Sequence, residues 1–334
     1  MDAMTKLKRL FAAAACCALA ALLLAGCGQS GQGGASAPPA PAGQAAGFYT
    51  FTDDLGREVT LDAAPRRVAA LTGSYADVWC TAGGQETLTA AASDAWSDFD
   101  LGLEEDTANL GGAMGVSVEA LLASAPDLVL ASTNIPSNQE MLPTLEAAGV
   151  QVAFFSVDTF EDYLRMLKVC TDLTGCPDRY ETYGAAVAEE IEAARARAAT
   201  ALEGRDAPTV LYIRAAASVV KPKGSEGTVL GEMLADLGCV NIADRDGSLL
   251  EELSMEAILA ADPEMIFFVL QGADPEPAQA QLEALVLSNP AWQQLTAVRN
   301  GRYYYMDKDL YHLKPNARWG EAYDGLVEIL YGEE

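Results

Sequence analysis

The sequence contains very little histidine, since His312 is the only one among 334 residues. Receptors for bare zinc or manganese ions combine several histidine and carboxylate ligands, which this chain cannot supply. Beyond residue 47 the sequence also has no G-x-S-x-G, H-E-x-x-H, Walker A or G-x-G-x-x-G pattern. These absences argue against a bare-metal receptor and against a hydrolase, and we predict no catalytic and no metal-binding residues.

Basic residues are scarce as well. The chain has 21 Lys and Arg against 48 Asp and Glu, which gives a formal net charge of −27. Nucleic acids and anionic membrane surfaces repel a protein of this charge. We therefore expect neither as a partner, so any contact with a membrane should be made through a lipid anchor only.

The cysteines exclude another group of sites. The sequence has no C-x-x-C pattern, which disfavours a zinc ribbon or a thioredoxin-like site. Cys170 and Cys176 are close enough in sequence to pair, but cysteine is also a common buried residue. The spacing leaves both possibilities open.

The first residues are typical of an export signal. A basic segment precedes the apolar run from Phe11 to Ala25, which is shorter than the ~20 residues of a membrane span. The run ends in "LAGC", which resembles the lipobox of bacterial lipoproteins, where Cys27 would carry the lipid; an ordinary secretory signal is the alternative. Residues 28–47 contain no charge and no large apolar side chain, as in a flexible tether. We predict a lipoprotein signal at 1–27, a tether at 28–47 and a lipid-anchored, extracytoplasmic protein.

The rest of the chain alternates between strand and helix patterns after a predicted β-hairpin at 48–61. Such alternation is typical of parallel βαβ units. Residues 178–204 are rich in Ala and Glu without a turn signal, which predicts a helix of roughly 40 Å. We therefore predict an α/β fold with two Rossmann-like lobes, residues 48–177 and 205–334, joined by one long rigid helix. The ligand cleft should lie between the lobes, at the carboxyl ends of the strands.

One unit occurs twice. Residues 117–129 read "SVEALLASAPDLV" and residues 254–266 read "SMEAILAADPEMI". In each copy a Ser can cap a helix, and a Glu in the first turn complements the helix dipole. Helix capping alone would explain one such unit. Its recurrence in both lobes predicts that Glu119 and Glu256 face a partner made of two matched subunits.

These units belong to a longer series that includes "PRRVAAL", "LEAAGVQV", "NPAWQQLTAVRNGRYYYMD" and "KPNARWGEAYDGLVEILYG". In this order the segments resemble the solute-binding lipoproteins of ABC importers for ferric siderophores, haem and cobalamin. The resemblance implies a monomeric receptor that delivers its cargo to a permease dimer with its ATPase. It implies no cofactor of the protein's own, with a ferric chelate or tetrapyrrole as cargo. It also implies that Glu119 and Glu256 dock onto arginines of the two permease subunits.

Candidate ligand contacts lie in segments that follow predicted strands. Aromatic side chains would stack on a chelate or macrocycle, and basic side chains would pair with its carboxylates or phenolates. The candidates are Tyr75, Trp79, Trp96, Arg214, Lys221, Tyr311, His312, Lys314 and Arg318.

Each candidate has a simpler explanation. Trp79 fits a helix core equally well, Lys221 a solvated surface, and His312 a structural position, although a Tyr or His at the cleft could ligate haem iron. The alternative functions are a secreted α/β enzyme acting on a small molecule, or a receptor for a different small ligand. Turnover of a substrate would indicate the enzyme.

Overall fold

The computed structural model describes residues 47–245, 247–251, 253–272 and 274–332. The predicted signal segment, Cys27 and the tether up to residue 46 lie outside these residues. Within the described ranges, no helix is both long enough and apolar enough to cross a membrane.

The N-terminal lobe is built on a parallel sheet with strand order β5-β4-β3-β6-β7. All five residues of its interior strand β6, "LVLAS", are buried. A continuous apolar run of this kind is typical of a parallel strand whose two faces are both covered by helices. The strands are β3 (Val68–Ala70), β4 (Leu88–Ala91), β5 (Ala108–Asn109), β6 (Leu128–Ser132) and β7 (Gln151–Phe155). The helices are α1 (Gly73–Thr81), α2 (Asp94–Ser97), α3 (Val118–Ala123), α4 (Pro136–Glu140), α5 (Leu142–Ala147) and α6 (Phe160–Thr174), with short 3-10 turns at Gln85–Thr87 and Ala113–Gly115.

The predicted hairpin is present as the antiparallel pair β1 (Tyr49–Thr52) and β2 (Glu58–Leu61). Asp53 in its turn is buried, and its carboxylate accepts hydrogen bonds from Arg57 and from the backbone N–H of Phe154. A buried carboxylate needs such partners. The turn residue therefore fastens the hairpin to β7.

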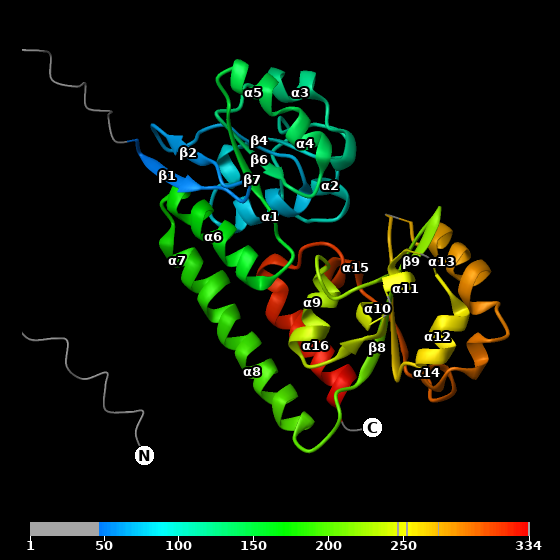
Figure 1. Ribbon diagram of the computed structural model, residues 1–334. Coiled ribbons are helices and arrows are strands. Elements are labelled where there is room, and N and C mark those ends of the chain that lie inside the picture. The colour runs from blue at the N-terminus through cyan, green and yellow to red at the C-terminus, as the bar shows by residue number, and fades with distance from the viewer. Residues whose placement is uncertain (1–46, 246, 252, 273, 333–334) are drawn as a thin grey trace, which may run out of the picture. The chain divides into compact units, whose positions relative to one another are not determined.

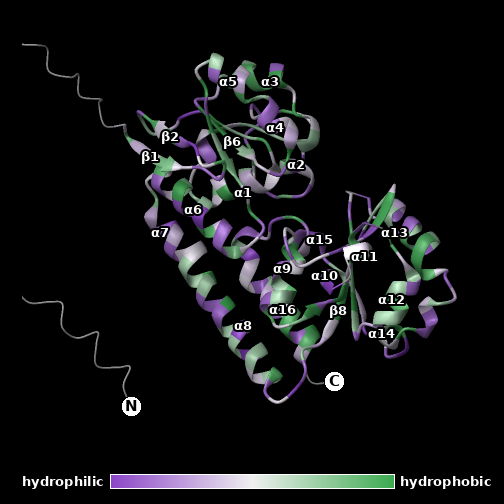
Figure 2. Ribbon diagram, in the orientation of Figure 1, coloured by the Kyte–Doolittle hydropathy of each residue, from purple (hydrophilic) through white to green (hydrophobic). Residues whose placement is uncertain are grey.

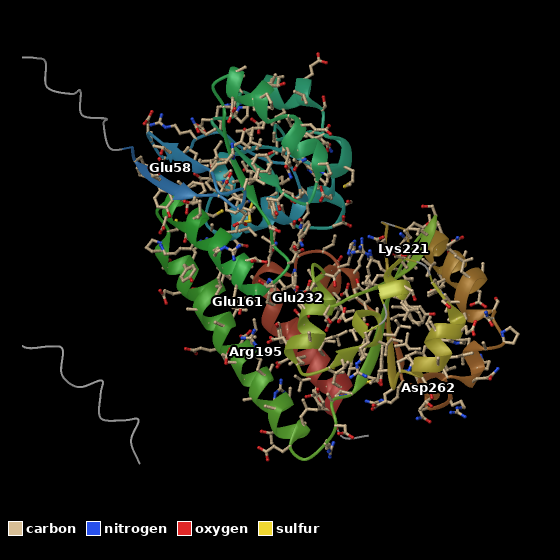
Figure 3. The ribbon with its side chains drawn as sticks, in the orientation of Figure 1. Glu58, Glu161, Arg195, Lys221, Glu232 and Asp262 are labelled. Carbon is tan, nitrogen blue, oxygen red and sulfur yellow. The ribbon has the colours of Figure 1, made fainter. Side chains whose placement is uncertain are left out.

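A continuous helical run joins the two lobes along one side (Figure 1). It consists of α7 (Pro177–Tyr180), a π-helical turn at Glu181–Ala185 and α8 (Ala186–Leu202). Arg195 on α8 contacts Glu161 of α6 at 3.4 Å, and it contacts Asp236 at the end of α9 (Val229–Asp236) at 2.6 Å. Figure 3 shows Arg195 beside Glu161. The helix is thus held to both lobes.

The C-terminal lobe has a parallel sheet with strand order β10-β8-β11-β12, and β9 pairs antiparallel with β8. The strands are β8 (Thr209–Ala216), β9 (Val219–Lys223), β10 (Val240–Asn241), β11 (Met265–Leu270) and β12 (Tyr303–Met306). The helices are α9 (Val229–Asp236), α10 (Ile242–Arg245), α11 (Gly247–Glu251), α12 (Met255–Ala261), α13 (Glu276–Leu282), α14 (Thr296–Arg299), α15 (Lys308–Tyr311) and α16 (Trp319–Tyr331), with a π-helical turn at Glu283–Leu287 and 3-10 turns at Trp292–Gln294 and Asn316–Arg318.

Two local details of this lobe concern segments that carry candidate ligand contacts. The segment around Lys221 forms the strand β9, whose residues "VVKPK" alternate between exposed and buried positions. The segment of Arg318 forms a 3-10 turn at Asn316–Arg318, and α16 starts only at Trp319. Asn316 in this turn has a φ of 53°, which an α-helix does not allow.

The apolar core is continuous between the lobes on the side that faces α8. Side chains of both sheets meet Ile191 and Ala194 of α8 in one cluster, and the rings of Phe160 and Trp319 contact each other with centroids 6.2 Å apart. Figure 2 shows the hydrophobic colouring concentrated on the strands. The four described cysteines are free thiols, and Cys170 is fully buried in this core.

Candidate functional site

A cavity of about 470 Å³ lies where the carboxyl ends of the two sheets meet. Its volume is in the range of small-molecule sites. Residues at or beyond the ends of β3, β5, β6 and β7 form one wall, and residues of β8 and of the segments after β9, β11 and β12 form the other. The lining consists of Thr72, Ser74, Tyr75, Met114, Ser132, Asn134, Ile135 and Asp158 from the N-terminal lobe, and Tyr212, Arg214, Gly227, Thr228, Val229, Gln271, Tyr311, His312 and Lys314 from the C-terminal lobe.

The tyrosines of the cavity are buried, and two have hydroxyl groups that already donate to backbone carbonyls. Tyr75 donates to the carbonyl of Phe155 at 2.8 Å, and Tyr311 donates to the carbonyl of Ala322 at 3.0 Å. Burial raises the pKa of Tyr75, and it raises the pKa of Tyr311 to about 12. These phenols therefore stay neutral and contribute ring surface to the wall.

Three cations share one face of the β8–β9 hairpin. Arg214 lies directly opposite Lys221, and Tyr212 lies opposite Lys223. Like charges facing each other across a strand pair are destabilising. Burial, and then the charges of Arg214 and Lys221, lower the pKa of Lys223. Among the residues that the structure describes, no carboxylate forms an ion pair with any of the three, and Arg214 is the member of this group that lines the cavity.

His312 lies between Arg214 and Gln271. Its Nδ1 is 3.3 Å from Arg214 Nη1, and its Nε2 is 2.7 Å from the Gln271 side-chain nitrogen. Burial lowers the pKa of His312 to about 4, and the positive charges of Arg214, Lys314 and two further lysines add to this effect. The imidazole is therefore neutral at neutral pH.

Polar contacts join the two lobes next to the cavity. Lys314 pairs with Asp158 at 2.8 Å, and Lys308 of α15 pairs with Asp98 at 2.7 Å. Asn316, fully buried, donates to the carboxylate of Asp77 at 2.7 Å. Burial raises the pKa of Asp77, and the hydrogen bond from Asn316 opposes that rise. Lys314 and Asp158 line the cavity, so one of these contacts between distant parts of the sequence belongs to its wall.

Five of the nine candidate ligand contacts lie together in this cavity: Tyr75, Arg214, Tyr311, His312 and Lys314. The prediction missed polar residues such as Ser132, Asn134 and Gln271. The available signal was their position, because each follows the end of a buried strand. Small polar side chains are common in loops, so the sequence did not single them out.

The other four candidates do not line the cavity. Trp79 is 1% exposed in the core and donates to Thr87, because α1 turns this side chain toward the sheet. Trp96 on α2 is 41% exposed, and Lys221 is exposed on β9, on the same hairpin face as Arg214 (Figure 3). Arg318 forms two hydrogen bonds with the neighbouring Glu321, at 2.7 and 2.8 Å.

The repeated unit has the same local structure in both lobes. Ser117 and Ser254 each cap a helix by accepting a hydrogen bond of 3.2 Å from the backbone N–H three residues later. Glu119 and Glu256 lie in the first turns of α3 and α12 and are exposed. Both helices run back toward the start of a parallel strand, so their first turns lie toward the same end of each sheet as the cavity.

No group of three His, Cys, Asp or Glu side chains within the described ranges could hold a metal ion. The cavity instead offers hydroxyl and amide groups, aromatic edges and an excess of positive charge. This combination suits an organic ligand with anionic groups better than a bare cation.

Comparisons with known proteins agree with this architecture. The family model described as periplasmic binding protein matches residues 68–310. No curated protein matches the sequence.

Several solved structures share the fold. A periplasmic haem-binding protein from Pseudomonas aeruginosa is 24% identical, with a TM-score of 0.65 over 80% of this chain and 93% of that chain. SirA from Staphylococcus aureus, complexed with staphyloferrin B, is 18% identical, with a TM-score of 0.63 over 84% and 98%. The periplasmic vitamin B12 binding protein of Vibrio cholerae is 19% identical, with a TM-score of 0.61 over 80% and 97%.

Proposed function

We propose, from the premise that this chain belongs to the periplasmic binding protein family, that it is the extracytoplasmic substrate-binding protein of an ABC importer. In this function it captures an iron complex, either a ferric siderophore or haem, or cobalamin, and delivers it to a permease dimer with its ATPase. The observation that carries the proposal is the cavity of about 470 Å³ formed by the strand ends of two lobes. Such a cavity binds a small molecule without requiring any catalytic group.

The cargo class is supported by the proteins that share this fold. Among them are a haem-binding protein, a protein complexed with staphyloferrin B and a vitamin B12 binding protein. In this chain, Tyr75, Arg214, Tyr311, His312 and Lys314 are the residues that we propose contact the cargo. Rings and cations together suit a flat or bulky chelate that carries anionic groups.

The absorption spectrum of the purified protein, followed by titration of the cargo-free protein, tests this function. A Soret band indicates haem, a corrinoid spectrum indicates cobalamin, and a charge-transfer band indicates a ferric siderophore. We expect stoichiometric binding of one class without turnover. Turnover of the bound molecule, or failure of all three classes to bind, would contradict the proposal.

Docking onto the permease is proposed for Glu119 and Glu256. Both carboxylates are exposed at matched first-turn positions, one in each lobe, as a partner with two equivalent subunits requires. If they served only the helix dipole, replacing each by Gln would cost at most about 1 kcal/mol of stability and leave delivery intact. If they contact arginines of the permease, delivery fails while cargo binding persists.

The test compares two double variants with the same change in charge. Glu119→Gln with Glu256→Gln should bind cargo normally but lose most of the stimulation of ATP hydrolysis by the reconstituted transporter. Glu58→Gln with Glu203→Gln, at exposed positions on β2 and after α8, should retain both properties. Normal stimulation of ATP hydrolysis by the first variant would mean that both glutamates act only at the start of their helices.

Lipid anchoring through Cys27 completes the proposal. The motif "LAGC" follows an apolar segment of signal length, and a tether precedes the folded part. Cys27→Ser should release the protein from membranes into the soluble fraction. Unchanged membrane retention of this variant would contradict the lipid anchor.

A further inference from the structure

The hydrogen bonds of His312 define its protonation. Arg214 can only donate, so the His312 Nδ1 atom that lies 3.3 Å from it must accept and carries no proton. In a neutral imidazole the proton then resides on Nε2, which is 2.7 Å from the Gln271 amide. The amide oxygen of Gln271 reaches this position by a half-turn of the amide group and accepts that proton. Both ring nitrogens are therefore engaged, and neither is free to ligate a metal.

The same contact fixes the guanidinium of Arg214. This side chain is half-buried, lines the cavity and forms no ion pair with any described residue. Of its five donors, one is accepted by His312 and another is shared with the hydroxyl of Tyr212, so further donors are available to a ligand in the cavity. Lys223 lies on the same hairpin face, one cross-strand pair away, and Lys221 lies directly opposite Arg214. A planar guanidinium beside two ammonium groups is a suitable partner for a carboxylate.

We infer that His312 is a positioning residue, whose unprotonated Nδ1 orients Arg214 so that Arg214, Lys223 and Lys221 form a subsite for a carboxylate of the cargo. The inference rests on the proposed function and narrows its cargo to carboxylate-bearing molecules. The carboxylate comes either from a ferric chelate such as ferric citrate or from the propionates of haem. It excludes cobalamin as the cargo, because that molecule presents no carboxylate to the subsite.

The surroundings of His312 are almost entirely cationic or neutral. The groups that face it are Arg214 and Tyr212 on β8, Lys223 on β9, Gln271 after β11, Lys308 and Tyr311 on α15, Lys314 after α15 and Asp158 of the other lobe. Asp158 is the only carboxylate among them, and Lys314 already pairs with it. A bound carboxylate therefore supplies the missing negative charge, and it should raise the pKa of His312 from its low value of about 4. Binding should then be accompanied by proton uptake at pH 4–6.

The single histidine makes this testable in the intact protein by nitrogen-15 NMR, because its signals need no assignment. In the cargo-free protein we expect the Nε2–H tautomer, and saturating citrate as a carboxylate probe should raise the pKa of His312 by roughly 1. An Nδ1–H tautomer would overturn the inference, and so would a His312 pKa that stays unchanged although citrate is bound. Neither measurement depends on the folding of a variant.

Two substitutions distinguish the roles of the two ring nitrogens of His312. The oxygen of Asn in His312→Asn takes the place of Nδ1 and can still accept from Arg214, whereas the oxygen of Gln in His312→Gln takes the place of Nε2. For ferric citrate or haemin, whichever binds, we expect Arg214→Gln and His312→Gln to weaken binding roughly tenfold or more. His312→Asn and the control Arg299→Gln, at an exposed position at the end of α14, should remain within about threefold of wild type.

The probes distinguish the two possible sources of the carboxylate. They also distinguish failure of the carboxylate subsite from failure of the proposed function. Binding of ferric citrate indicates a ferric chelate, whereas binding of haemin that is lost for its dimethyl ester indicates the propionates. Binding of cyanocobalamin that Arg214→Gln leaves unchanged would overturn the inference while the proposed function stands. Equal affinities of His312→Asn and His312→Gln would overturn the positioning role.

Discussion

The two lobes are alike in scaffold and unlike in the walls that they present to the cavity. Each has a parallel sheet and the same capped helix leading into a buried strand. The N-terminal wall offers hydroxyl and amide groups and one carboxylate, Asp158. The C-terminal wall offers Arg214, His312 and Lys314, with Lys223 beside them. The duplicated elements thus position the two walls of the cavity, whereas loop residues that differ between the lobes determine which chemical groups line it.

The copies of the repeated unit share one strained backbone position but carry different side chains there. Ala125 has a φ of 47° and Asp262 a φ of 40°, both in the left-handed region before a proline. The side chain of Asp262 accepts hydrogen bonds from the backbone and hydroxyl of Thr296, at 2.7 and 2.6 Å. Ala125 has no side-chain oxygen for this purpose. The same strained turn is therefore supported by side-chain hydrogen bonds in one lobe only.

The largest expected effect concerns the candidate aromatic residues of the N-terminal lobe. Trp79→Ala should lower the free energy of unfolding by about 3–5 kcal/mol, because it empties a large buried volume. The matched change Trp96→Ala, at a side chain 41% exposed, should cost about 1 kcal/mol or less. Denaturant titration measures both. Similar losses for the two variants would contradict the contrast between core and surface.

An intermediate effect is expected where the oppositely charged walls meet. Lys314→Gln leaves the carboxylate of Asp158, 20% exposed, without its partner and should cost about 1–2 kcal/mol of unfolding free energy. Adding Asp158→Asn should restore part of this loss. The exposed pair Arg318–Glu321 is the control and should contribute about 0–1 kcal/mol in the same double-mutant cycle. A coupling energy no larger than that of the control would show that the contact does not hold the lobes together.

The smallest effects compare the two left-handed turns and should have opposite signs. Ala125→Gly should stabilise the protein by about 0.5–1 kcal/mol, since glycine adopts a positive φ without steric cost. Asp262→Gly gains the same relief but loses two hydrogen bonds to Thr296, so we expect a net loss of about 1 kcal/mol. Thermal unfolding of both variants measures the difference. A change of the same sign in both would mean that the side-chain bonds of Asp262 contribute nothing.

The sequence predicted the repeating architecture because periodicity is a local property. The apolar run "LVLAS", the capping serines and the uninterrupted Ala- and Glu-rich segment each determine their own conformation. The exposed positions of Glu119 and Glu256 also follow from their place in a first helical turn. The rule that ligand sites lie beyond the carboxyl ends of strands located the cavity.

Which side chains share that cavity was decided only by the tertiary structure. Trp79 and Tyr75 lie on one helix, yet α1 turns Trp79 into the core and leaves the ring of Tyr75 at the cavity wall. Arg214 and His312 are 98 residues apart, and only the parallel arrangement of β8, β11 and β12 brings them together. Helix and strand patterns are set by neighbours along the chain, whereas charge pairing and the protonation of His312 depend on residues that only folding brings within hydrogen-bonding distance.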